Sequence, residues 1–244
     1  MKENVNIKLP TAWTELSDIQ LRYVFSLLLA NLSFTQVKIH CLLKWGDLKF
    51  VRKEGALFLF RQKGRNYLLS ASAVNGALAH LAFIDAIPGY PVRLSHIGWH
   101  KPFRADFQDV PFGDFLTLDN LYQGYLQQKN SSFLVQMAQI MYNAPKIKLD
   151  AVEELSIFYW FASVKQYLSQ MYPHFLKVRK NNDDEELSQP SFRQLMEAMN
   201  TQIRALTGGD ITKEEAVLKM DCWRALTELD AKAKDYEEIS RKKK

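Results

Sequence analysis

Two histidines, His96 and His100, have the i, i+4 spacing that would place both imidazole rings on one face of a helix and suit a metal ion. Gly98 lies between them and Pro102 follows, so the sequence disfavours a helix in this stretch. No acidic or thiol ligand stands at a fitting distance to complete a metal site. The sequence therefore predicts a polar loop here and no bound metal.

The other histidines offer little for nucleophilic catalysis. His40 stands beside Cys41, but neighbouring residues in a helix point about 100° apart, so the imidazole and the thiol would not face each other. His80 and His174 stand alone in the sequence. None of the five histidines forms a recognisable triad with a serine and an aspartate. We expect these histidines to be surface residues or hydrogen-bonded core residues.

Phosphate-binding loops and acid–base pairs are equally weak candidates. Residues 208–210 lack the lysine and serine of a phosphate-binding loop and follow a helical pattern, so they are expected to end one helix and lead into the next. The carboxylate pairs at 153–154, 214–215 and 237–238 fall at expected helix starts or exposed ends, and we expect them to be solvated. The sequence therefore predicts no catalytic residue, no cofactor and no enzymatic activity.

Composition and charge indicate an ordinary packed protein. Of its 244 residues, 47% are hydrophobic and 24% are charged, which is typical of a globular fold. The net charge is +5, but 27 acidic residues are interspersed among 32 basic ones. The dense basic runs are short, at 179–180 and 241–244, and are expected to be solvated ends. Nucleic acid is therefore the less favoured partner.

Cysteine usage and hydropathy bear on the compartment. Cys41 and Cys222 lie far apart within apolar helical patterns, so they are expected to be buried thiols in a reducing environment. The first residues lack the apolar run of a signal peptide. The longest uncharged apolar stretch, 155–164, is shorter than the roughly 20 residues that span a bilayer. We expect a cytoplasmic protein without membrane contact.

The first third combines two helices with a small sheet. Ser17 with Gln20, and Ser33 with Gln36, have the spacing of a capping box, and each precedes an apolar helical pattern. Residues 48–69 then form short β-type runs separated by breaks that contain glycine. The sequence predicts an antiparallel helix pair followed by a β-meander that packs on the helices.

The middle third contains the longest loop and the most aromatic helix. Residues 85–113 are rich in proline and glycine and are expected to be irregular. Residues 115–125, 133–142 and 152–172 have helical spacing, and the last of these is apolar nearly all round its centre, which predicts a buried helix. Within the loop, one interleaved aromatic and basic patch is the best candidate for stacking and phosphate contact. It consists of Trp99, His100, Lys101, Phe103 and Arg104.

The last third is a helical appendage set off by a polar break. One apolar stripe precedes residues 208–209, Thr212 and Glu215 have capping-box spacing, and a seam with spacings of four and three follows. We expect the stripe and the seam to contact a partner, and the surface they meet belongs either to this chain or to another. The expected contact residues are Phe192, Leu195, Met196, Met199, Ile203, Leu226, Leu229 and Tyr236.

The predicted fold is therefore mainly α, with a helical core, a small antiparallel β-meander at about residues 48–69 and a C-terminal helical appendage. The expected boundaries are a core domain at 1–180, a polar linker at 181–190 and the appendage with its basic tail at 191–244.

Three stretches of the chain carry a family resemblance. The first comprises Leu9-Pro10, Trp13, Glu15-Leu16-Ser17 and Gln20-Leu21; the second comprises Phe112-Gly113-Asp114-Phe115, Tyr122, Tyr125 and residues 134–142. The third comprises residues 206–214, Val217-Leu218, Trp223, Ala225-Leu226 and Tyr236-Glu237-Glu238. Together they resemble uncharacterised proteins from phages and prophages of gut Bacteroidetes, found among tail and morphogenesis genes.

The resemblance implies a structural or assembly role in building a phage tail, for example as an assembly factor for the elongated tape-measure protein. It implies a phage tail component as partner and a location in the host cytoplasm or the phage particle. The group has no catalytic motif to match, so it supplies no site residues. The alternative function is a nucleic-acid-associated module that uses Lys101, Arg104, Arg179, Lys180 and the basic tail at 241–244.

Overall fold

The protein is mainly α-helical with one small antiparallel sheet, as the sequence predicted. The structure is a computed structural model that describes residues 7–176 and 192–242, so Arg179, Lys180, the linker at 181–190 and residues 243–244 lie outside it. The first elements are η1 (Trp13–Glu15), α1 (Asp18–Leu29), α2 (Phe34–Trp45), β1 (Lys49–Glu54), β2 (Leu57–Gln62), β3 (Arg65–Ser70), α3 (Ala71–Ala79) and η2 (Ala82–Asp85). They are followed by α4 (Phe112–Gln128), α5 (Ser132–Met141), α6 (Ala151–Met171), α7 (Phe192–Thr207), η3 (Ile211–Lys213), α8 (Glu214–Leu218) and α9 (Cys222–Lys242).

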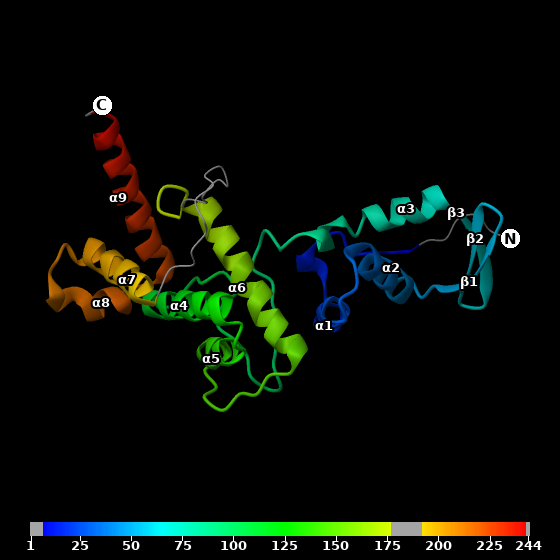
Figure 1. Ribbon diagram of the computed structural model, residues 1–244, viewed down its shortest axis with the longest axis horizontal. Coiled ribbons are helices and arrows are strands. Elements are labelled where there is room, and N and C mark those ends of the chain that lie inside the picture. The colour runs from blue at the N-terminus through cyan, green and yellow to red at the C-terminus, as the bar shows by residue number, and fades with distance from the viewer. Residues whose placement is uncertain (1–6, 177–191, 243–244) are drawn as a thin grey trace.

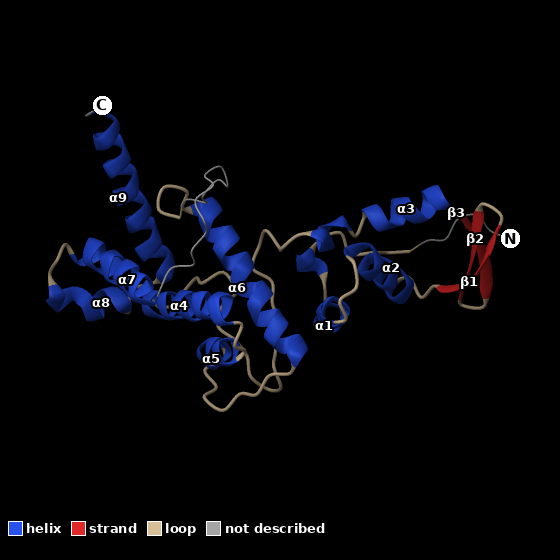
Figure 2. Ribbon diagram, viewed as in Figure 1, coloured by secondary structure: helices blue, strands red, loops and turns tan. Residues whose placement is uncertain are grey.

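These elements form an elongated molecule (Figure 1). The sheet lies at one end, α7, α8 and α9 lie at the other, and α6 crosses the middle (Figure 2). Within the described residues, the sheet is the only β-structure longer than an isolated bridge. The two ends of the molecule therefore present different kinds of surface, one of strands and one of helices.

The two capping boxes predicted in the first third of the chain are confirmed. The Gln20 backbone N–H donates to the Ser17 hydroxyl, and the Ser17 N–H donates to Gln20 Oε1 at 3.0 Å; Ser33 and Gln36 form the same pair of bonds. Each box satisfies two N–H groups that a helix start otherwise leaves without a partner. A third box, between Asp150 and Glu153, opens α6.

The predicted box between Thr212 and Glu215 is wrong. The Thr212 N–H and hydroxyl both donate to Asp210 Oδ1, at 3.0 and 2.6 Å, so Asp210 caps the short η3. Helix α8 then begins at Glu214 without a side-chain cap. Asp210 provides the cap in place of Thr212 because its carboxylate accepts the N–H two residues further along the chain. This is the local geometry that aspartate favours before a helical turn.

The sheet is a meander with strand order β1-β2-β3 and all neighbours antiparallel. Gly55 and Gly64 occupy its two turns with φ of 59° and 77°, conformations that only glycine adopts without strain. Phe60 and Leu69 belong to the main core, whereas Phe50 is 48% exposed at the sheet edge. The sheet is therefore held to the helices by a few apolar residues on one face.

Helix α6 is the buried centre of the fold. Trp160 and Phe161 have no solvent exposure, and Phe107 from the long loop stacks on Trp160 with ring centroids 5.6 Å apart. The Trp160 Nε1 donates to the Ala105 carbonyl at 3.0 Å. On the other side, Phe25 of α1 lies 5.3 Å from the Tyr159 ring. The aromatic residues that predicted burial thus join three separate parts of the chain.

Trp13 fixes the N-terminal segment that precedes α1 to the body of the protein. Its indole Nε1 donates to the carbonyls of Phe83 and Ala86 at 2.8 and 3.1 Å, and its ring is 5% exposed. A buried indole generally needs such a partner for its N–H. This segment is therefore part of the core.

The start of α9 closes the other side of the core. The Cys222 N–H donates to the Val110 carbonyl at 2.8 Å, and the Phe112 N–H donates to the Met220 carbonyl at 2.8 Å. Trp223 Nε1 donates to the Asp106 carbonyl at 2.7 Å. The described helices of the appendage therefore pack on their own chain.

A matched pair of tryptophans tests the role of α6. We expect Trp160→Ala to lower the free energy of unfolding by about 3 to 5 kcal/mol, because it removes a fully buried ring and leaves a cavity. Trp99 is 86% exposed, so Trp99→Ala should change it by less than about 0.5 kcal/mol. Urea denaturation of the two variants measures both values, and equal losses would contradict the buried position of Trp160.

Candidate functional site

The structure divides the residues expected to contact a partner into buried and exposed groups. Ile203, Leu226 and Leu229 are at most 6% exposed and lie within the core of this chain. Met196 and Met199 are half-buried, and the Asn120 amide of α4 lies 3.5 Å from the Met199 sulfur. For Ile203, Leu226, Leu229 and Met199, the surface they meet belongs to this chain.

Tyr236 is the one expected contact residue that the structure places fully in solvent, with 73% exposure. One turn further, Ile239 is 53% exposed, and sequence reasoning did not include it. Phe192 and Leu195 lie in α7, but their side chains are outside what the structure describes. The open part of the predicted surface is therefore the C-terminal end of α9.

Polar contacts brace this end of α9 against the segment that follows α6. Asp230 accepts the N–H groups of His174 and Phe175 at 2.8 and 2.9 Å. His174 Nδ1 lies 3.2 Å from Glu237 Oε2. These contacts hold α9 in place as far as Glu237, in its fifth turn, and so they also position the neighbouring Tyr236 and Ile239.

The candidate nucleic-acid patch in the loop is only partly assembled. Phe103 turns inward, with its ring centroid 5.9 Å from that of Trp160. Arg104 lies 3.0 Å from Asp106, and although burial acts to raise the pKa of Asp106, hydrogen bonds from Arg104 and from the Gln108 N–H lower it overall. Trp99 and Lys101 remain exposed. Of this patch, the exposed parts are therefore the Trp99 ring, whose centroid lies 5.5 Å from that of His100, and Lys101, which forms no ion pair among the described residues.

Carboxylates and histidines form no metal cluster in residues 7–176 and 192–242. His96 and His100 do not share a helix face, because the chain turns between them and Ile97 forms an isolated β-bridge with His100. The expectation that Glu153 is solvated is wrong: its carboxylate is 11% exposed and lies 2.7 Å from Arg22. This ion pair links α1 to the start of α6, a long-range contact that local pattern could not reveal.

Both cysteines are fully buried and separate, as expected from their apolar neighbours. Burial raises the pKa of Cys41 to about 12. Burial also raises the pKa of Cys222 strongly, with a further contribution from the neighbouring Asp221 carboxylate. Neither thiol is poised for nucleophilic chemistry, because the reactive form is the thiolate.

A cavity of about 500 Å³ lies between η1 and the loop, lined by residues that include Trp13, Asp18 and Arg93. Arg93 donates one bond to the Phe103 carbonyl, while its buried Nε and Nη1 have no hydrogen-bond partner within the described chain. Burial lowers the pKa of this guanidinium to about 10. Sequence reasoning missed Arg93, since a lone arginine in a loop gives no local sign of burial.

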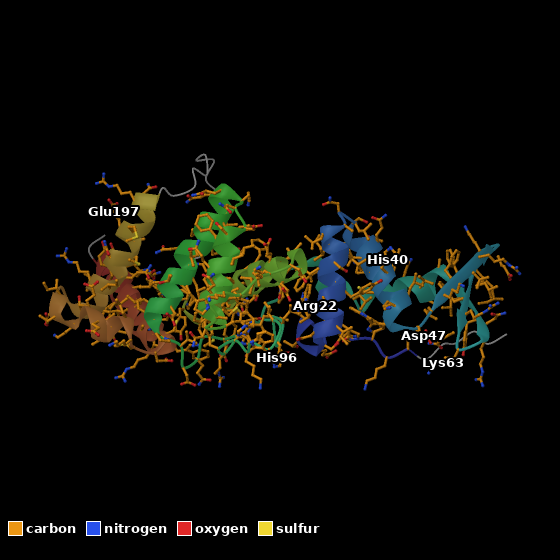
Figure 3. The ribbon with its side chains drawn as sticks, turned by 90° about the horizontal axis from the view of Figure 1, so that it is seen from below. Arg22, His40, Asp47, Lys63, His96 and Glu197 are labelled. Carbon is orange, nitrogen blue, oxygen red and sulfur yellow. The ribbon has the colours of Figure 1, made fainter. Side chains whose placement is uncertain are left out.

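A second cleft, of about 460 Å³, lies between α2 and the hairpin formed by β1 and β2. Its cationic lining residues are Lys44, Lys49, Arg61 and Lys63, joined by His40 and Tyr23, with Asp47 as its carboxylate. Figure 3 shows His40, Asp47 and Lys63 grouped at this end of the molecule. We call this feature the basic cleft.

Sequence reasoning missed the basic cleft because it looked for runs of basic residues. Here the four cations lie at positions 44, 49, 61 and 63, so they form no run in the sequence. The net charge of a sliding window would have found it: residues 44–65 contain seven Lys or Arg and two Asp or Glu, a net +5. This equals the charge of the whole chain, so the remaining residues carry 25 charges of each sign.

Comparison with known proteins adds no family to this picture. No family model, no curated protein and no solved structure matches the chain. Across residues 7–176 and 192–242, every helix is too short or too polar to cross a lipid bilayer. The function proposed below therefore rests on the geometry of the described surfaces.

The two thiols provide a test of the buried positions. We expect neither Cys41 nor Cys222 to react with Ellman's reagent in the folded protein at about pH 8, because burial holds both as neutral thiols. Both should react promptly in guanidinium chloride. A fast reaction of either thiol under native conditions would contradict this packing.

Two arginines provide a second test. Arg22→Met should cost about 1 to 3 kcal/mol of unfolding free energy, because it leaves the Glu153 carboxylate buried without its cation. Arg93→Met should be neutral within about 1 kcal/mol, since it removes a buried guanidinium whose Nε and Nη1 have no hydrogen-bond partner among the described residues. Urea denaturation compares the two, and an equal cost would show that Arg93 has a partner in solution.

Proposed function

We propose that this protein is a non-enzymatic assembly factor that binds a helical protein partner through the C-terminal end of α9. The observation that supports the proposal is the change in solvent exposure along the apolar seam of α9, the row of residues that contains Leu226, Leu229 and Tyr236. Leu226 and Leu229 are buried in the core, whereas Tyr236 and Ile239, further along α9, are exposed. The seam thus continues beyond the part that this chain covers.

The geometry of this end suits a second helix. Residues 226, 229, 233 and 236 follow spacings of three, four and three, the pattern by which helices pack side by side. Tyrosine is among the residues that most often dominate protein interfaces. Because contacts from Asp230 and Glu237 already hold α9 in place, a partner would lose little free energy to ordering it.

The resemblance to phage and prophage proteins suggests the process in which the partner takes part. On that basis the process is phage tail morphogenesis, and the partner is an elongated helical tail component such as the tape-measure protein. The protein would act in the host cytoplasm or within the phage particle. An elongated molecule with an accessible helix at one end is compatible with such a role (Figure 1).

The α9 surface can be tested without disturbing the core. The variant Tyr236→Lys with Ile239→Glu should weaken binding to the tape-measure protein of the same genome at least about tenfold, because it places charges in an apolar contact. Isothermal titration calorimetry measures the affinity. Lys234→Ala on the same helix is the matched control and should bind normally.

A truncation of residues 234–242 gives a second measurement. It leaves the buried segment from Cys222 to Leu229 intact, so the fold should survive while binding is lost. Partner binding that persists at full affinity after both changes would refute the proposed role of α9.

The residues expected for the alternative function, association with nucleic acid, provide few free cations. Arg104 forms an ion pair with Asp106, whereas Lys101 is exposed and forms no ion pair among the described residues. Arg241 and Lys242 are exposed at the end of α9, and the other expected cations lie outside the described residues. The positive charge that could support this alternative is concentrated in the sheet instead.

A further inference from the structure

We propose that the basic cleft binds the phosphate backbone of nucleic acid. Its cations come from three places: Lys44 from the last turn of α2, Lys49 from β1, and Arg61 with Lys63 from the end of β2 and its turn. This assignment is independent of the proposed function, because the cleft lies at the opposite end of the molecule from α9 (Figure 1).

The cations in the cleft lack internal compensation. Lys49 and Arg61 are direct cross-strand partners, an arrangement of like charges that destabilises a sheet. Among the described residues, Lys44, Lys49 and Lys63 form no ion pair. Arg61 donates one bond to the neutral Asn66 side chain at 3.3 Å. An external anion would relieve this repulsion.

Other cations of the same sheet show the contrast. Arg52 lies 2.6 Å from Glu54, and Lys53 lies over the Phe58 ring with its Nζ 5.9 Å from the centroid. These two interact with an anion or an aromatic ring of the chain, whereas among the described residues the cations that line the cleft form no ion pair. The unpaired positive charge of the sheet is therefore gathered where a ligand could enter.

The residues around the cleft favour a chain of phosphates over a membrane surface as its ligand. A membrane-binding face would place exposed apolar residues beside the cations. Here Phe50 is exposed, but it follows Lys49 directly in β1, so the two side chains point to opposite faces of the sheet. Four cations lining one cleft can contact the phosphates of a nucleic-acid backbone, which Lys and Arg bind without reading sequence.

Fluorescence anisotropy with labelled 20-nucleotide DNA, single-stranded and duplex, tests the proposal on the full chain. We expect binding whose logarithmic salt slope is roughly −3 to −4, so that affinity falls about 100-fold between 50 and 200 mM salt. Lys49→Gln with Arg61→Gln should weaken binding at 50 mM salt about tenfold or more. Lys44→Gln with Lys63→Gln, a second variant outside the strand pairing, should do the same.

A matched control separates the cleft from net charge. Lys219→Gln with Lys232→Gln removes two charges at the helical end and should leave DNA binding within about twofold of wild type. Circular dichroism and thermal melting check that all variants fold. Failure to bind DNA at 50 mM salt, or equal losses in cleft and control variants, would overturn the proposal. Tighter binding to phosphatidylserine vesicles than to DNA would overturn the assignment to nucleic acid.

Discussion

The burial of α6 is the constraint on which the rest of this structure depends. Its aromatic side chains point in every direction, so one neighbour cannot remove them all from water. Phe25 covers Tyr159 from α1, Phe107 stacks on Trp160 from the long loop, and the Tyr122 ring of α4 packs 5.1 Å from Phe161. Because each cover comes from a different part of the chain, burying α6 also fixes how those parts lie relative to one another. The proline-rich loop becomes ordered for this reason, despite having almost no regular structure of its own.

The sequence predicted what local chemistry determines and missed what distant contacts determine. Ser17 with Gln20 marked a helix start correctly because both partners of the cap lie within four residues. The aromatic density of α6 likewise predicted its burial. Glu153 was misjudged because its cation, Arg22, lies 131 residues away. The basic cleft was missed for a related reason: its cations come from a helix and two strands, and only the folded hairpin brings them together.

The two ends of the molecule differ in how their exposed apolar and charged side chains are arranged. At the helical end, apolar residues pass from the core into solvent along α9, and some of the nearby charges form ion pairs, as Lys219 does with Glu215. At the sheet end, Lys49 stands opposite Arg61 across the strands, and few apolar residues hold the sheet to the helices. One surface is suited to shape complementarity and the other to electrostatic attraction, which is long-range and sensitive to salt. Joined by a rigid aromatic centre, they could hold two unlike partners at a fixed separation.

The contacts between the loop and the start of α9 also set an order of events during synthesis. Val110 accepts the Cys222 N–H, and Asp106 accepts the Trp223 indole N–H, so these partners are made more than a hundred residues apart. While the chain is being translated, those carbonyls stay without these partners until the start of α9 leaves the ribosome. Residues 222–229, made more than a hundred residues after the loop, therefore complete this side of the core. A ribosome that stops before residue 222 would release a chain whose central helix is still partly uncovered.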